Sequence, residues 1–248
     1  MKLAVWSGPR NLSTALMYSF ANRPDCVATD EPFYAAFLDQ TGLDHPMAEE
    51  VKRAQATDAD AVASALAGPV PDGAALWYQK HMCHHMVPDF PLGWMASCRH
   101  LFLIRHPARV IASYVAKRDT VRVDDIGVRQ QLRLYSHCQS LGQTPLVVAA
   151  EDIRGNPNAM LRAVCAALGI AFYPEMLRWP AGPKPYDGVW AQHWYGAVHQ
   201  STGFAEAEGP VPDLSGVERD ILAEAMPYYQ ALADKALTPA AVTRGEQF

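Results

Sequence analysis

The sequence has few of the features that mark exported, membrane-spanning or disulfide-stabilised proteins. Its five cysteines are an odd number and form no Cys-x-x-Cys pair, which favours reduced thiols over a disulfide framework. No apolar run reaches the roughly 20 residues that span a bilayer. The chain opens on a strand-like run and shows no signal-peptide pattern. We therefore expect a cytoplasmic protein without a membrane partner.

Positive charge is also scarce. The 21 lysines and arginines are outnumbered by 26 acidic residues, which gives a formal net charge of −5. Without a broad basic surface, nucleic acid is not an expected partner, and any anionic ligand must be held by a local group of cations. The length of 248 residues and the 50% hydrophobic content suit one domain. We expect this domain over residues 1–237 and a flexible tail over 238–248, and the pattern leaves the oligomeric state open.

Short apolar runs alternate with helical patterns along the chain. The expected strands are Leu3–Trp6, Cys26–Thr29, Leu76–Gln79, Leu101–Ile104 and Leu146–Ala149. The clearest helices are Ser13–Ala21, Ala59–Leu66, Arg109–Lys117, Val128–Cys138, Asn158–Leu168 and Val217–Leu237. This order predicts an α/β fold with three layers (α/β/α) around a central, mostly parallel five-stranded sheet. Ligands of such sheets bind beyond the carboxyl ends of the strands, so the residues after each strand are the site candidates.

The turn Ser7–Thr14, between the first strand and the first helix, is typical of a phosphate-binding loop. A helix that begins near Ser13 directs backbone N–H groups and the positive end of its dipole toward one point, and Arg10 adds a cation. The hydroxyls of Ser13 and Thr14 suit either helix capping or phosphate binding. The NTPase string G-x-x-x-x-G-K-[ST] is absent, and Arg105 follows a later strand where such enzymes place an acid. NTP hydrolysis is therefore disfavoured.

A second cationic strand end follows Leu101–Ile104. Arg105 comes directly after this strand, Pro107 makes a turn, and Ser113 lies on the second turn of the next helix. Arg105 and Ser113 are thus expected to face the same pocket. Taken alone, this pair is more typical of a surface arginine and a serine that bonds its own helix backbone.

Together these motifs resemble the sulfotransferases that use 3′-phosphoadenosine 5′-phosphosulfate (PAPS), in their P-loop-like bacterial branch. In that family a loop like P-[KR]-S-G-[TS]-[TS] binds the 5′-phosphosulfate, and R-x-P-x-x-x-x-x-S binds the 3′-phosphate. The segment Pro9-Arg10-Asn11-Leu12-Ser13-Thr14 resembles the first motif, and Arg105, Pro107 and Ser113 match the second at identical spacing. The stretch Val147–Gly169 is also similar to the family. The resemblance implies a P-loop NTPase-like sulfotransferase fold, PAPS as co-substrate, no metal, and sulfuryl transfer to a hydroxyl or amine of a small-molecule acceptor.

The chain departs from the family pattern at two positions of the first loop. Leu12 replaces a glycine, so a loop that needs positive φ there is not expected to close in the same way, and Gly8 is expected to supply the freedom instead. Ala15 replaces an aromatic residue that stacks on adenine. The stacking ring is then expected from Trp190, Trp194 or Tyr195, in the aromatic-rich stretch Pro180–Pro212. Gly188 and Trp190 loosely match a family loop that covers the nucleotide.

The resemblance also implies candidates for the chemistry. Arg10 and Lys80 suit neutralisation of the leaving phosphate, with Lys80 expected just after the strand Leu76–Gln79. The general base is either Glu31, in a Glu-Pro motif after the second strand, or one of the histidines that follow Lys80. These histidines are His81, His84 and His85. The residues leave this choice open.

Three other interpretations have weaker support in the sequence. The compact group His81-Met82-Cys83-His84-His85 invites a zinc site, but it lacks a second ligand pair at a usual spacing. A phosphotransferase on the same fold would require Mg²⁺ and ATP, and the missing Lys-Ser/Thr ending speaks against it. A binding module without turnover is favoured only by Leu12 and the missing stacking aromatic. The acceptor is not specified by the sequence.

Overall fold

The centre of the computed structural model, which describes residues 1–116 and 121–238, is a five-stranded sheet. The strands are β1 (Lys2–Ser7), β2 (Cys26–Asp30), β3 (Leu76–Met82), β4 (Arg99–Ile104) and β5 (Leu146–Ala149). All neighbouring strands pair in parallel, in the order β2-β3-β1-β4-β5. The predicted α/β class and five-stranded sheet are confirmed, and the sheet is parallel throughout.

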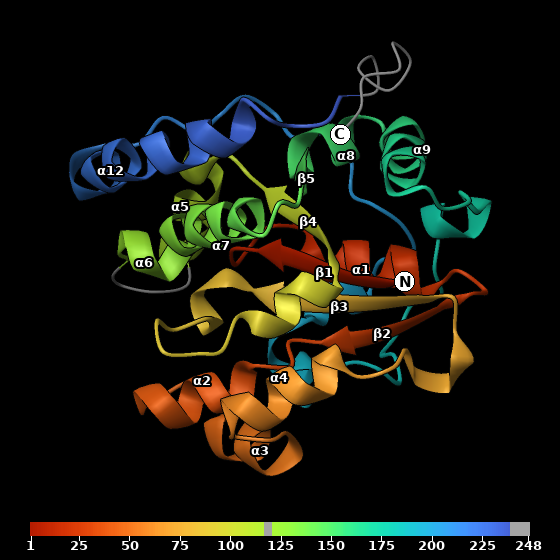
Figure 1. Cartoon of the computed structure of the whole chain (residues 1–248). Coiled ribbons are helices and arrows are strands. Elements are labelled where there is room, and N and C mark those ends of the chain that lie inside the picture. The colour runs from red at the N-terminus through yellow and green to blue at the C-terminus, as the bar shows by residue number, and fades with distance from the viewer. Residues whose placement is uncertain (117–120, 239–248) are drawn as a thin grey trace.

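Helices cover both faces of this sheet (Figure 1). They are α1 (Ser13–Ala21), α2 (Tyr34–Thr41), α3 (Ala48–Ala54), α4 (Ala59–Ala67), α5 (Pro107–Val115), α6 (Val123–Ile126), α7 (Val128–Ser140), α8 (Ala150–Gly155), α9 (Pro157–Leu168), α10 (Ala191–Trp194), α11 (Gly196–His199) and α12 (Gly216–Ala233), with 3-10 turns η1 (Pro71–Gly73), η2 (Cys83–His85), η3 (Gly93–Ser97) and η4 (Pro174–Leu177). Helix α1 packs on β2 and β3, whereas α7 packs on β4. Because the crossovers through α1 and α7 run in opposite directions across the sheet, right-handed connections put these helices on opposite faces.

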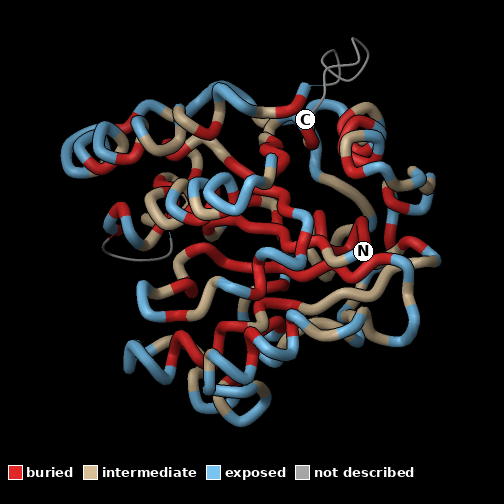
Figure 2. Tube along the Cα trace, viewed as in Figure 1, coloured by how far each residue is buried: buried red, intermediate tan, exposed pale blue. Residues whose placement is uncertain are grey.

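The core lies along the central strands. Residues Leu3–Ser7 of β1 and all seven residues of β3 are buried, and the buried part of the chain runs through the middle of the sheet in Figure 2. Parallel strands with helices on both faces lose contact with water on both sides. For this reason β3 buries Gln79, Lys80 and His81 as completely as its apolar residues.

The connections of the sheet diverge on the two sides of β1, and a crevice lies at the carboxyl end of this strand. The chain leaves β1 toward β2 at one edge, whereas β4 lies on the other side of β1. Loops on the two sides of such a topological switch point diverge, and ligands of α/β sheets bind there. The loop after β1, the end of β3 and the residue after β4 therefore meet at one place.

Several element boundaries differ from the sequence expectation. Strand β3 continues to Met82, so Lys80 lies within the strand and not after it. The pattern missed this because a polar run in a strand buried on both faces has no apolar signature. Helices α2 and α3 were also not expected. The predicted helix end at Lys117 lies outside the described residues, as does the predicted tail 238–248 except for its first residue. The single domain over residues 1–237 stays a prediction.

Two further expectations concern the thiols and the membrane. All five cysteines are free, and four of them are buried, in agreement with reduced thiols. Among the described helices, none combines the length and the apolar character needed to cross a membrane.

Candidate active site

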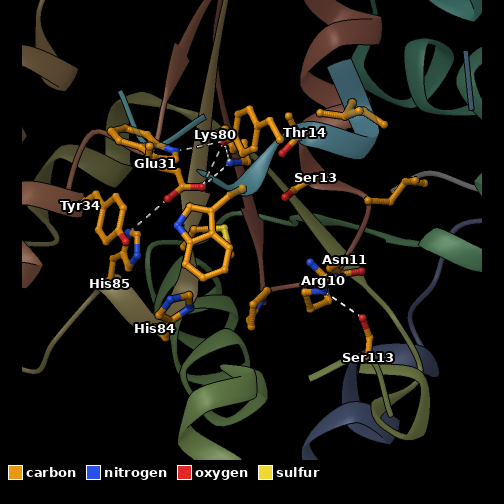
Figure 3. Close-up of a pocket in the computed structure, with 18 of the residues that line it drawn as sticks. Arg10, Asn11, Ser13, Thr14, Glu31, Tyr34, Lys80, His84, His85 and Ser113 are labelled. Carbon is orange, nitrogen blue, oxygen red and sulfur yellow. Dashed lines mark hydrogen bonds and ion pairs between the residues drawn. The ribbon is translucent and has the colours of Figure 1, made fainter. Parts of the chain in front are cut away.

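A cavity of about 510 Å³ lies at the switch point (Figure 3). One end is formed by the loop after β1 together with Arg105 and Ser113, and the other end by Glu31 and Lys80. The remaining lining residues are Ala15, Tyr34, His45, Met82, His84, His85, Tyr114, Trp190, Trp194, Tyr195, Ala197 and Val198. The structure thus brings together in one cavity Pro9, Arg10, Asn11, Leu12, Ser13, Thr14, Glu31, Lys80, His84, Arg105, Ser113 and Trp190 from the predicted set.

The loop after β1 adopts its curved path without glycine at the turning points. Arg10 and Leu12 have φ values of 59° and 62°, in the left-handed region. The Asn11 side chain is buried, and its Nδ2 donates to the Leu103 carbonyl at 2.5 Å, which fastens the loop to β4. The expectation that Leu12 prevents this closure is therefore wrong. Leucine adopts the conformation at a cost of about 1–2 kcal/mol, which the surrounding contacts must offset.

Gly8 serves a different purpose from the one expected. A Cβ atom at this position would lie 2.4 Å from the Ile126 carbonyl oxygen, at the end of α6. Gly8 is not among the residues with positive φ. The residue is thus required for the close approach of two backbone segments, and the conformational freedom assigned to it is not used.

The first turn of α1 borders the cavity, which Ser13, Thr14 and Ala15 line. No side chain of the described residues caps this helix, whose N-cap residue is Leu12. The first N–H groups of a helix have no partner within the helix. Together with the hydroxyls of Ser13 and Thr14, which line the cavity, they form a set of donors suited to a phosphate or sulfate group.

Beside the loop after β1, the cavity brings together Arg10, Arg105 and Ser113, which come from two motifs far apart in the sequence. Arg10 Nε donates to Ser113 Oγ at 2.9 Å, and Arg105 Nη1 donates to the Arg10 carbonyl at 2.5 Å. Burial, and then the charge of Arg105, lower the pKa of Arg10 from its usual value. Two guanidinium groups near enough for the charge of one to lower the pKa of the other favour the binding of an anion nearby.

At the other end of the cavity, Lys80 is enclosed by acidic and hydroxyl groups. Its Nζ donates to Asp30 Oδ1 at 2.9 Å, to Tyr195 OH at 2.7 Å, and to Glu31 Oε1. These bonds use all three N–H donors of the ammonium group. Burial acts to lower the pKa of Lys80, but Asp30 and Glu31 outweigh it and hold this pKa above its usual value.

Glu31 follows β2 directly and is itself buried, with a φ of 42°. Burial raises the pKa of its carboxyl group, the Lys80 ammonium opposes this, and the neighbouring Asp30 raises it further. Oε1 is bound by Lys80, whereas His85 Nδ1 lies 3.9 Å from Oε2, beyond hydrogen-bond range. In the described part of the chain Oε2 has no hydrogen-bond donor, so this oxygen is the one that can accept a proton from a ligand.

The aromatic-rich stretch after Pro180 closes over this acidic cluster. The Tyr195 hydroxyl donates to Asp30 Oδ2 at 2.7 Å, and the Gly188 N–H donates to the same oxygen at 3.2 Å. Trp190 Nε1 donates to Tyr195 OH at 3.2 Å. A Cβ atom on Gly188 would lie 2.2 Å from the Trp190 ring, so glycine permits this packing. Gly188 therefore supports the cavity wall but does not line the cavity.

The three candidate histidines separate in the structure. His84 and His85 line the cavity, and burial lowers the pKa of His85 well below its usual range, with His84 and Lys80 adding to the effect. His81 lies on the opposite face of β3, where its ring stacks on Trp6 with centroids 4.4 Å apart. Neighbouring residues of a strand point to opposite faces, so Lys80 and His81 cannot both face the cavity.

Asp30, Tyr34 and His45 are among the residues of the site that sequence reasoning missed. Asp30 directly precedes Glu31 in the sequence, and two adjacent carboxylates at the end of a strand could have indicated a buried pair. Tyr34, whose ring stacks on His85 with centroids 4.5 Å apart, and His45 come from a segment with no recognisable motif. No group of three or more metal-ligating side chains is found among residues 1–116 and 121–238, and the metal-free chemistry stays a prediction.

Comparison with known proteins identifies the same family that the sequence motifs resemble. A family model described as a sulfotransferase domain matches residues 1–236. Two curated relatives in Arabidopsis thaliana, named branched-chain-amino-acid aminotransferase-like proteins 2 and 1, are 35% identical over 227 residues and 36% identical over 229 residues. Each match covers 92% of this chain but 40% of the relative, so the chain spans well under half the length of these relatives.

Solved structures share the fold. The sulfotransferase domain from the curacin biosynthetic pathway superposes with a TM-score of 0.53 at 18% identity, over 91% of this chain and 97% of that one. A sulfotransferase from Alicyclobacillus acidocaldarius superposes with a TM-score of 0.53 at 12% identity, over 95% and 96% of the two chains. At these identities the likeness shows the arrangement of strands and helices.

Proposed function

The chain belongs to the sulfotransferase-domain family, and we propose that it transfers a sulfuryl group from PAPS to a hydroxyl or amine of a small-molecule acceptor. The observation that carries this proposal is that one cavity holds both predicted phosphate-binding motifs and a buried carboxylate. Arg10 and Ser113, 103 residues apart in the chain, are bonded at one end, and Glu31 lies at the other.

The residues at the first end fit the bound donor. The N-terminus of α1, with Ser13 and Thr14, would hold its 5′-phosphosulfate, while Arg105 and Ser113 would hold its 3′-phosphate. When bound, the donor supplies a sulfuryl group on a phosphate leaving group. We assign neutralisation of the leaving phosphate to Arg10, because the three donors of Lys80 are already bonded within the protein.

The residues at the second end fit the removal of a proton. In the transfer, an acceptor oxygen or nitrogen forms a bond to sulfur while the bond from sulfur to the phosphate oxygen breaks, and its electron pair leaves with the phosphate. The acceptor proton passes to Oε2 of Glu31. Burial raises the pKa of this carboxylate toward neutral pH, where a general base is most effective. Lys80, Asp30 and Tyr195 hold this carboxylate in place.

A thermal-shift comparison tests the proposal. We expect 3′-phosphoadenosine 5′-phosphate to stabilise the protein more than ADP or AMP, and Arg105→Ala to abolish this difference. Arg99→Ala is a matched control, because Arg99 is exposed at the opposite end of the same strand. Equal shifts for all three nucleotides would contradict PAPS as donor. Mg²⁺-dependent stabilisation by ATP would favour the phosphotransferase alternative, and binding without transfer to any acceptor would favour a binding module.

A further inference from the structure

The guanidinium group of Arg105 is already occupied by a carboxylate. Its Nη2 donates to Glu208 Oε1, and its Nε donates to Glu208 Oε2 at 3.4 Å. This is the two-pronged arrangement in which arginine binds carboxylates and phosphates. Glu208 therefore takes the edge of Arg105 that is best suited to a phosphate group.

Two more arginines converge on the same carboxylate. Arg154 Nη1 donates to Glu208 Oε1, and Arg109 Nε lies 3.3 Å from Glu208 Oε2. The Glu208 side chain is only 9% exposed. Neither Arg109 nor Arg154 belonged to the predicted site, yet both share an anion with Arg105, which lines the cavity.

The charges of this cluster balance better with a dianion than with Glu208. The three arginines face two carboxylates, since Glu151 Oε1 also lies 3.5 Å from Arg109 Nε. One positive charge is left over. A phosphate monoester carries a charge of about −1.5 to −2 at pH 7. A phosphate monoester in place of the Glu208 carboxylate would leave the cluster nearly neutral. A singly charged group in the same place would leave the net charge of the cluster unchanged.

We propose that Glu208 is a specificity-determining residue, an internal anion that occupies the position of the donor's 3′-phosphate. A nucleotide with a 3′-phosphate displaces it from Arg105, Arg109 and Arg154, and a nucleotide without this group does not. Arg109 and Arg154 are thereby additional ligands of the phosphate. This inference rests on the proposed function, because it takes the donor to be PAPS.

Calorimetric titration of Glu208→Gln with 3′-phosphoadenosine 5′-phosphate and with AMP tests the inference. The two nucleotides differ only in the 3′-phosphate. If Glu208 fills the site about 90% of the time, its removal should tighten binding of the bisphosphate about tenfold and leave AMP binding unchanged. Inorganic phosphate should likewise raise the melting temperature of Glu208→Gln more than that of the unmodified protein.

Glu206→Gln is the matched control. It removes the same charge two residues away, but Arg154 binds the backbone carbonyl of Glu206 and not its carboxylate. If Glu208→Gln folds poorly, Glu208→Asp shortens the side chain by one methylene and should give a smaller tightening.

Unchanged or weaker binding of the bisphosphate by both Glu208 variants would overturn the inference and show that the carboxylate is only a structural clamp. The assumption that PAPS is the donor is tested separately. If the unmodified protein and all variants bind the bisphosphate no better than AMP, PAPS is not the donor.

Discussion

Lys80 and Asp30 form an ion pair inside the sheet, with Nζ and Oδ1 2.9 Å apart and each side chain only 1% exposed. The two residues come from neighbouring strands and are register partners in the pairing of β2 with β3. Two buried carboxylates, Asp30 and Glu31, thus share one ammonium group. The arrangement links the stability of the sheet to the charge state of the proposed base.

The first prediction concerns Asp30→Asn. Lys80 keeps Glu31 as its counter-charge, but Lys80, Tyr195 and Gly188 lose a charged acceptor in a buried place. The free energy of unfolding should therefore fall by about 1–3 kcal/mol. Urea unfolding measures this change. Glu49→Gln is the control, because the Glu49–Lys52 pair is at the surface and its loss should not be detectable. An Asp30→Asn variant as stable as the unmodified protein would show that the pair contributes nothing to the fold.

The second prediction separates Glu31 from His81. Glu31→Gln should lower kcat by about 10²–10⁴-fold, the usual contribution of a general base, with nucleotide affinity unchanged. His81→Phe should keep kcat, because the phenyl ring can replace the imidazole against Trp6 and Trp94. Steady-state kinetics with a sulfated product as readout measure both. A large kcat loss in His81→Phe, with full activity in Glu31→Gln, would reverse the assignment.

The third prediction concerns the pH dependence of the same step. Only the ionised form of Glu31 accepts a proton, and burial raises its pKa above the ordinary value of 4.5. The rate should therefore increase as the pH rises through a midpoint above 4.5 and then level off. In Asp30→Asn the neighbouring negative charge is gone, so the pKa of Glu31 falls and the midpoint should move to lower pH. A midpoint that stays in place would exclude Glu31 as the titrating group.

The fourth prediction concerns Leu12. Leu12→Gly removes the cost of positive φ but also a side chain that packs on the core, and the two effects are each on the order of 1 kcal/mol. We expect little change in stability and intact nucleotide binding. Leu12→Val places a branched Cβ in the same left-handed conformation and should destabilise the protein clearly in thermal unfolding. Equal stability of the two variants would mean that the loop does not hold this conformation.

The residues of the first loop were recognisable because they are contiguous and follow a strand. The same holds for Arg105 and Ser113, because they lie only a few residues apart and so form a short sequence motif. What the pattern could not specify was how the loop turns: Leu12 adopts the left-handed conformation because Asn11 is tied to the Leu103 carbonyl on β4, a partner 92 residues away. Local propensity loses to tertiary contacts of this kind.

The sequence by itself determined the five strands and their alternation with helices, and with it the edge of the sheet at which the ligand-binding residues gather, because parallel strands end on one side. Tertiary structure alone decided which of the candidate side chains share the cavity. The length of β3 put Lys80 on one face and His81 on the other, and the closure of the loop around Tyr195 enclosed the ammonium group of Lys80. These outcomes depend on burial and on partners far apart in the chain, such as Glu208 on Arg105, and no local pattern records them.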